Sequence, residues 1–375
     1  MNELIIAAKP RKSIHWQLLS TACILALFTA VTSQTASAAP DDADHSTVWI
    51  ELGGQLERIS GQGQPFTPGF VTDYADSPAF AAGSAIQSQR NPRYSKGLEG
   101  KVTLTPQGSD WSFSAALLYG RANGNRRVHQ QTAGHPLPDG FYGQGNPTMD
   151  PENIKAYSDV RNKDAASRLL LDFKVGKDVG FGAFGRDSSS KISLGMRFAQ
   201  FASEKNVSMV GRPDVHFYGS IGKYWTNFDA KAKTERSFTG LGPSISWDGS
   251  STILGSKDSG MSFDWGAGAA VLFGRQKAHV KHQAYSTEFK KYNFLYSNPV
   301  GYRSSPPAAS RRRSVVVPNV SGFAGISLHR ANAKVSLGYR GDFFFGAMDT
   351  GIDRRKTETM SFHGPFATIS IGLGG

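Results

Sequence analysis

The chain has 375 residues, a formal net charge of +12 and a single cysteine, Cys23. That length is ample for one large domain, and a lone cysteine excludes an internal disulfide framework and a cysteine metal site. The basic balance favours partners that carry phosphate or other anionic groups, and for an exported chain it favours lipopolysaccharide over nucleic acid.

An apolar run, Leu18–Val31, opens the chain; basic Lys9, Arg11 and Lys12 precede it and Ala36-Ser37-Ala38 follows it. This order predicts a secretory signal peptide over 1–38, cleaved after Ala38. The alternative of an uncleaved anchor needs about 20 apolar residues, more than this run offers. We therefore expect residues 39–375 to form a single exported domain.

The rest of the chain alternates apolar and polar residues with a period of two, which is typical of strands. Glycine occurs 42 times and aromatic residues make up 11% of the chain, as in many all-β proteins. The predicted strands are 46–58, 97–105, 111–121, 166–175, 190–203, 224–237, 241–248, 260–273, 276–287, 316–328, 333–347 and 360–373.

These segments are long enough to cross a membrane. The stretch 263–273 is roughly 33 Å long as a strand and rises roughly 25 Å when tilted, which matches the apolar band of an outer-membrane barrel. Long connections mostly alternate with tight ones, such as 106–110 and 329–332. The pattern predicts an all-β, antiparallel, up-and-down transmembrane β-barrel of about 12 strands, with 10 to 14 possible, in the Gram-negative outer membrane. A soluble β-protein is the alternative.

One face of the predicted strands carries charge, which inside a barrel needs water or a partner. The side chains expected to line a pore are Lys101, Arg197, Lys334, Arg340, Glu51, Asp264 and Asp342. The segment 276–313 has eight basic residues and one acid, and we expect it to form a basic outer loop at the pore mouth. The residues singled out there are Arg311, Arg312, Arg313, Lys290 and Lys291.

Motifs of known chemistry are absent from the sequence. There is no Gly-x-Ser-x-Gly, Gly-Lys-Ser/Thr or His-Glu-x-x-His pattern. His279 and His282 lie three apart, so on a regular strand they face opposite sides and cannot share a metal. We expect no catalytic residue, no metal and no cofactor.

The C-terminal half resembles the Legionella-type major outer membrane protein family, in an uncharacterised proteobacterial branch. The blocks that carry the resemblance are 237–244, 264–268, 272–275, 338–345 and 362–366, within roughly 160–375. The resemblance implies a pore-forming outer-membrane protein.

Together these features predict a porin-like protein, not an enzyme, that passes small, anionic solutes by diffusion. The expected partners are outer-membrane lipid, lipopolysaccharide, those solutes and the barrel-assembly machinery, with the oligomeric state unknown. Two alternatives stay open. A structural or adhesive barrel would have a lumen closed by paired charges and inserted loops. A barrel hydrolase would have a Ser/His or Asp/His cluster at its outer rim.

Overall fold

The computed structural model describes residues 46–61, 94–131, 157–180, 188–212, 215–218, 222–255, 259–292, 295–296, 300–304 and 306–373. The predicted signal peptide, 1–38, lies outside the described residues and stays a prediction. Within the described ranges no helix is long and apolar enough to cross a membrane.

The described chain is built from antiparallel strands. They are β1 (Thr47–Ser60), β2 (Tyr94–Thr105), β3 (Trp111–Gln131), β4 (Tyr157–Asp178), β5 (Ser188–Arg212), β6 (Val215–Tyr218), β7 (Gly222–Gly255), β8 (Ser259–Tyr292), β9 (Leu295–Tyr296), β10 (Val300–Ser304), β11 (Ala309–Arg330), β12 (Ala333–Asp349) and β13 (Thr357–Leu373).

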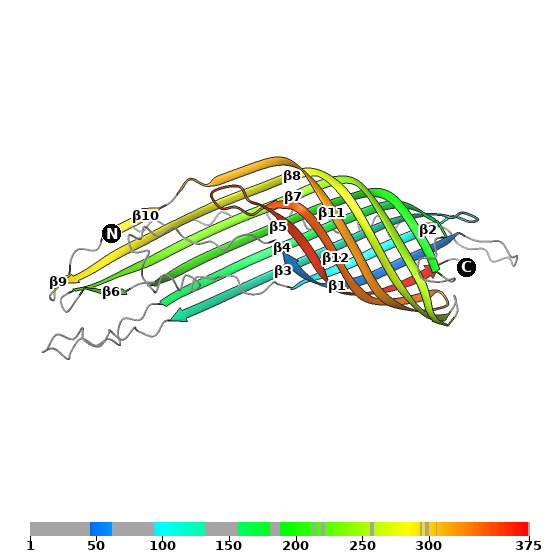
Figure 1. The fold of residues 1–375 in the computed structure, drawn as a ribbon, viewed down its shortest axis with the longest axis horizontal. Coiled ribbons are helices and arrows are strands. Elements are labelled where there is room, and N and C mark those ends of the chain that lie inside the picture. The colour runs from blue at the N-terminus through cyan, green and yellow to red at the C-terminus, as the bar shows by residue number, and fades with distance from the viewer. Residues whose placement is uncertain are drawn as a thin grey trace, which may run out of the picture. The chain divides into compact units, whose positions relative to one another are not determined.

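Ten of these strands close into a barrel (Figure 1). The order around the wall is β1-β2-β3-β4-β5-β7-β8-β11-β12-β13, and pairing of β13 with β1 completes the circle. The short strands β6, β9 and β10 only extend the edges of β7 and β8. The predicted barrel is confirmed, with ten strands in place of the twelve favoured by the sequence.

Two pairs of predicted strands are in fact single strands, which accounts for the difference. Segments 224–237 and 241–248 both belong to β7, and 260–273 and 276–287 both belong to β8. Gly240 and Gly274, taken as turn residues, are instead paired with each other across these strands. A Cβ on Gly240 would lie 2.6 Å from the Phe238 ring, and one on Gly274 would lie 2.8 Å from it. The glycines make room for an aromatic ring and do not mark turns.

Every strand of the barrel presents a large apolar side chain outward. One exposed example from each strand in chain order is Leu52, Leu98, Phe113, Phe173, Leu194, Ile245, Val271, Val320, Leu337 and Ile369. Trp247 and Trp265 pack edge to face near one end of this band, with ring centroids 4.9 Å apart. A continuous apolar exterior around a closed, fully hydrogen-bonded wall is what a bilayer requires, so the barrel belongs to the outer membrane.

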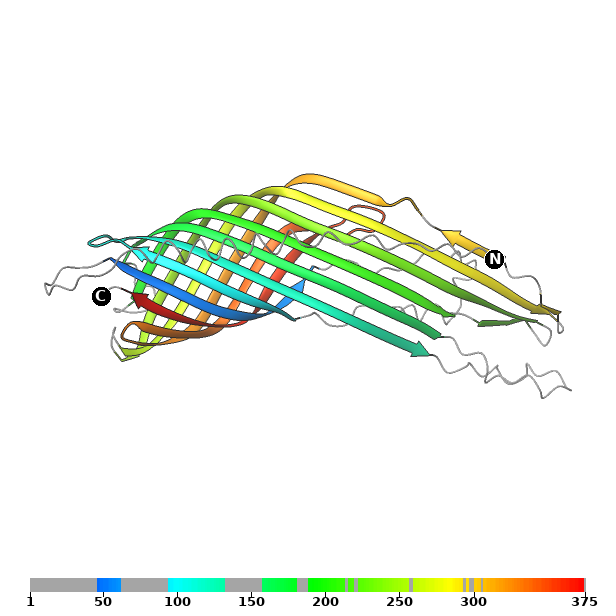
Figure 2. The same cartoon turned by 180° about the vertical axis from the view of Figure 1, so that it is seen from behind.

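Several strands continue beyond the closed barrel on the side opposite the short turns (Figure 1, Figure 2). Pairing of β2 with β3 ends at Lys96 and Arg121, whereas β3 stays paired with β4 up to Gln131. On the other flank, β11 leaves β12 at Asn319 and Phe344 but stays with β8 as far as Ala309. The extension is therefore an open sheet of β3, β4, β5, β7, β8 and β11. Short turns mark the periplasmic end of such barrels, so this sheet is extracellular.

Candidate functional site

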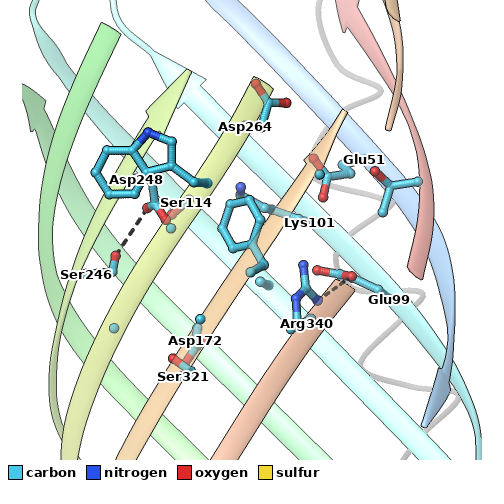
Figure 3. A pocket seen from close by; sticks show the side chains of 18 of the residues that line it. Glu51, Glu99, Lys101, Ser114, Asp172, Ser246, Asp248, Asp264, Ser321 and Arg340 are labelled. Atoms are coloured by element: carbon cyan, nitrogen blue, oxygen red, sulfur yellow. Dashed lines mark hydrogen bonds and ion pairs between the residues drawn. The ribbon is translucent and has the colours of Figure 1, made fainter. Parts of the chain in front are cut away.

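The interior of the barrel contains a polar cavity of about 360 Å³ in the half nearer the short turns (Figure 3). Inward positions of the strands supply its lining, because side chains alternate between lumen and lipid. All seven residues predicted to line a pore lie on its wall: Glu51, Lys101, Arg197, Asp264, Lys334, Arg340 and Asp342. Whether they line a conducting path stays a prediction.

Most of the charges in this cavity are paired across the lumen. Arg340 on β12 contacts Glu99 on β2 at 2.6 Å, as Figure 3 shows. Lys334 contacts Asp264 at 2.5 Å, and Asp264 also accepts a hydrogen bond from Ser250 at 2.6 Å. Hydrogen-bonded pairs of this kind hold the walls of the barrel together.

The cavity wall is also balanced in charge. Its lining includes six basic residues, Lys101, Lys174, Lys191, Arg197, Lys334 and Arg340, and six acidic ones, Glu51, Glu99, Asp172, Asp248, Asp264 and Asp342. The expected preference for anions rested on a basic excess in the lumen and on the basic segment 276–313. The described lining has no such excess, because Lys174 and Lys191 are matched by Glu99, Asp172 and Asp248, which the sequence reasoning had left out.

A layer of buried ion pairs lies on the extracellular side of the cavity. Arg168 on β4 contacts Glu57 on β1, and its other terminal nitrogen lies 3.2 Å from Asp342 on β12. All three residues are at most 3% exposed. Strands β4 and β12 are five places apart in both directions around the ten-strand wall, so this contact spans the full width of the barrel.

Arg197 on β5 extends the same layer. Two of its nitrogens bind the two carboxylate oxygens of Asp172, each at 2.7 Å, and a third contact reaches Asn319 on β11 at 2.6 Å. A bidentate arginine–carboxylate pair fixes both side chains in one geometry. The ion pairs therefore form a rigid layer of side chains that spans the lumen.

An aromatic cluster follows directly above these ion pairs. The Phe201 ring on β5 lies 5.2 Å from Phe362 on β13 and 4.6 Å from Phe344 on β12, between ring centroids. Phe238 stacks on Phe201 at 5.7 Å, and all four rings are at most 1% exposed. Since β5 and β13 are also opposite each other in the wall, the rings bridge the lumen from side to side.

The five residues singled out for the predicted basic outer loop belong to strands. Arg311, Arg312 and Arg313 belong to β11, where they pair with Ala278, Lys277 and Gln276 of β8. Lys290 and Lys291 belong to β8, and their side chains lie outside the described residues. The charges were assigned to a loop because the sequence shows no sign of how far the strands extend past the membrane.

Arg311 points inward and holds the connection between β12 and β13, residues 350–356. Its guanidinium binds Asp349 at 2.7 Å and the carbonyl oxygens of Gly351 and Ile352 at 2.6 and 2.9 Å. Arg236 donates to the carbonyl of Thr350 at 2.8 Å. This connection is thus fixed against the inner face of the extracellular sheet, just above the aromatic cluster.

Neither the role of Arg168 nor the aromatic cluster was predicted from the sequence. Phe343 and Phe345 face outward and are 42% and 46% exposed, as in the aromatic girdles of outer-membrane barrels. Phe344 between them points into the lumen. The sequence did carry a sign of this cluster, because an aromatic residue occupies an inward-facing position in several strands.

Two histidines outside the membrane contact aspartates. His129 Nδ1 lies 3.0 Å from Asp159 on the outer part of β3 and β4. His282 Nε2 lies 2.7 Å from Asp353, while His279 faces the other side of β8, as predicted. No group of three or more potential metal ligands occurs among the described residues.

Comparisons with known proteins gave distant structural similarities. No family model and no curated protein sequence matches the chain. Among solved structures, the outer-membrane protease OmpT of Escherichia coli is similar, with 13% identity and a TM-score of 0.37 over 90% of this chain and 100% of that one. LpxR of Salmonella typhimurium has 8% identity and a TM-score of 0.24, covering 87% and 99%. The toluene transporter TodX of P. putida has 7% identity and a TM-score of 0.21, covering 90% and 91%.

Similarities this distant carry no argument about what the chain does. From its own geometry, the protein is a ten-stranded transmembrane β-barrel of the outer membrane, with a layer of buried ion pairs and an aromatic cluster across its lumen.

Proposed function

We propose that this chain is a closed, non-conducting barrel that anchors its extracellular β-sheet in the outer membrane and displays it at the cell surface. The contact of Phe201 with Phe362 carries this proposal, because the two rings meet from opposite walls at 5.2 Å. The Arg168 ion pairs directly beneath form a second barrier. A barrel of about eight strands already has an interior that side chains can fill, and ten strands leave little more space.

The porin-like function expected from the sequence is the competing proposal. It needs a continuous aqueous path, and the contacts within the two layers support the closed barrel over such a path. Membership of the Legionella-type major outer membrane protein family also stays a proposal, supported by blocks such as 338–345 and 362–366.

The test is single-channel recording of the purified full chain in planar bilayers. We expect no stable conductance steps at 1 M salt, with heat-modifiable migration on gels showing that the inserted protein is folded. Regular steps of uniform size from folded protein would overturn the closed barrel and restore the diffusion pore.

The His129–Asp159 contact favours a second candidate, a barrel hydrolase at the outer rim. The hydrogen bond with His129 is the main reason why the pKa of Asp159 lies below its usual value, and nearby Arg127 adds to the effect. An ionised carboxylate that orients an imidazole is one part of a general-base site. Loss of a peptidase or esterase activity in His129→Ala, with the activity kept in His279→Ala, would establish this candidate. Equal activity in both variants would exclude His129 as the base.

A further inference from the structure

The outward face of the extracellular sheet becomes basic above the lipid-facing band. On β8, Phe273 is 59% exposed at the upper part of this band, and Lys277 and Lys281 follow on the same face. Lys281 lies eight residues past Phe273, which corresponds to roughly 20 Å along the membrane normal for a tilted strand. This is the height of the headgroups and sugars of the outer leaflet, beyond its acyl chains.

A groove of about 610 Å³ crosses the sheet at this height. Its walls come from β4, β5, β7 and β8, and residues 306–308 close one side where the chain bulges between β10 and β11. The charged residues of its described lining are Arg161, Lys163, Lys231, Lys233 and Lys281, with no acid among them. A concave surface of one sign concentrates anions.

Strand register places these cations in a row. Lys163 pairs with Asn206, Asn206 with Lys233, and Lys233 with Lys281. With strands about 4.8 Å apart, the backbones of Lys163 and Lys281 are about 14 Å apart. The row is wide enough to contact more than one phosphate.

Two of the five cations have carboxylate partners of their own. Lys231 lies 3.3 Å from Asp229, and Lys233 lies 2.6 Å from Glu235. Arg161, Lys163 and Lys281 form no ion pair within the described residues, although all three are exposed and face the groove. These three are the cations available to a ligand.

We propose that this groove binds the phosphorylated headgroup of lipopolysaccharide from the surrounding outer leaflet. The groove lies on the outer wall of the sheet, so it faces the neighbouring lipids sideways. Arginine and lysine form charge-assisted hydrogen bonds to phosphate oxygens, and several such contacts add affinity and salt dependence. Asn206 and Ser208 are half-buried in the same groove, where the amide oxygen of Asn206 and the hydroxyl of Ser208 suit the sugars between the phosphates.

The experiment measures binding of lipopolysaccharide to the detergent-purified full chain. The groove variant is Arg161→Gln/Lys163→Gln/Lys281→Gln, and the matched control, Lys177→Gln/Arg330→Gln/Arg355→Gln, removes the same charge from exposed sites outside the groove. We expect the groove variant to bind about tenfold more weakly, or worse, and the control to bind like the wild type. The charge-preserving variant Arg161→Lys/Lys163→Arg/Lys281→Arg should keep most of the affinity.

Two further arms identify the ligand. Lipopolysaccharide whose core phosphates have been removed should bind the wild type as weakly as the groove variant binds the intact glycolipid. Millimolar inorganic phosphate should not displace it, because a free ion engages only one part of the row. Equal losses of lipopolysaccharide affinity in the groove variant and the control would refute the proposed site. Displacement by inorganic phosphate would show a simple anion site in its place. Either result is independent of conductance, so it leaves the closed barrel untouched.

Discussion

At the scale of single residues, the most informative feature is the buried charge of Arg168. Its guanidinium touches Glu57 and Asp342 from two other strands and packs 4.5 Å over the ring of Phe362. It is 1% exposed, so its charge depends on these partners and not on water. A buried ion pair adds little net stability over a well-packed apolar replacement, but removing one partner leaves the other charge unpaired.

We therefore expect Arg168→Met to destabilise the barrel by about 3–5 kcal/mol, because buried Glu57 would lose its ion-pair partner and Asp342 would keep only the longer contact with Arg197 at 3.8 Å. The triple variant Arg168→Met/Glu57→Gln/Asp342→Asn should recover much of this loss. Urea unfolding in micelles, followed by gel mobility, measures both. Arg58→Met on the exposed outer face is the control and should change stability by less than about 0.5 kcal/mol. Similar losses of stability in the Arg58 and Arg168 variants would contradict the buried ion pairs of Arg168 with Glu57 and Asp342.

At the scale of elements, the connection between β12 and β13 links the barrel to the extracellular sheet. Asp349 accepts hydrogen bonds from the backbone of Gly351 and Lys356, each at 3.2 Å, which shapes the connection from within. Arg311 then attaches it to β11 through Asp349 and two carbonyl oxygens. Arg311 therefore has a structural role, so replacing all three arginines 311–313 is not neutral for folding.

Arg311→Ala should release residues 350–356, because two hydrogen bonds to the connection and two to Asp349 directly before it are lost while the strand itself stays paired. Hydrogen exchange there should rise by about tenfold or more, on the basis of roughly 1.5–3 kcal/mol for each charge-assisted bond. Arg312→Ala is the matched control, since this side chain is exposed on the opposite face of β11. An equal increase in hydrogen exchange in both variants would argue against the role of Arg311 in holding residues 350–356.

At the scale of the whole barrel, the surface is apolar toward lipid and the interior is polar and aromatic. The register of β8 decides which residues face which side: Ala269 and Val271 are exposed outward, and Asp264 and Gly268 line the cavity. This arrangement agrees with the faces expected from the alternation in the sequence. The wall is continuous, so the cost of an added charge depends on the side it enters and, on the lipid side, on its depth in the membrane.

Val271→Arg should cost about 2–4 kcal/mol, because it places a charge in the hydrocarbon. Gly268→Ser should cost less, since a Cβ there meets the Ser321 hydroxyl oxygen at 2.8 Å and that small side chain can rotate away. Unfolding in lipid vesicles compares the two. If Gly268→Ser were the more damaging change, the register of β8 would be shifted by one residue.

The sequence by itself determined the class of fold and the two faces of each strand. Alternation with a period of two reports which side chains share a face, so the inward charges Lys101, Arg197 and Lys334 and the outward Val271 could be identified without a structure. The number of strands was predicted less well. Gly240 and Gly274 make room for the ring of Phe238 within β7 and β8, whereas glycines at such positions in a sequence usually mark turns.

Only the tertiary structure decided what fills the lumen. Phe201 and Phe362 are 161 positions apart in the sequence, and Arg168 and Asp342 are 174 apart, yet each pair meets across the barrel. Local patterns cannot show such contacts, because they depend on how many strands close the circle and on the register between strands. The same closure places Lys163 beside Lys233 and Lys281 on the outer wall, so the basic groove also follows from the fold and not from any single segment.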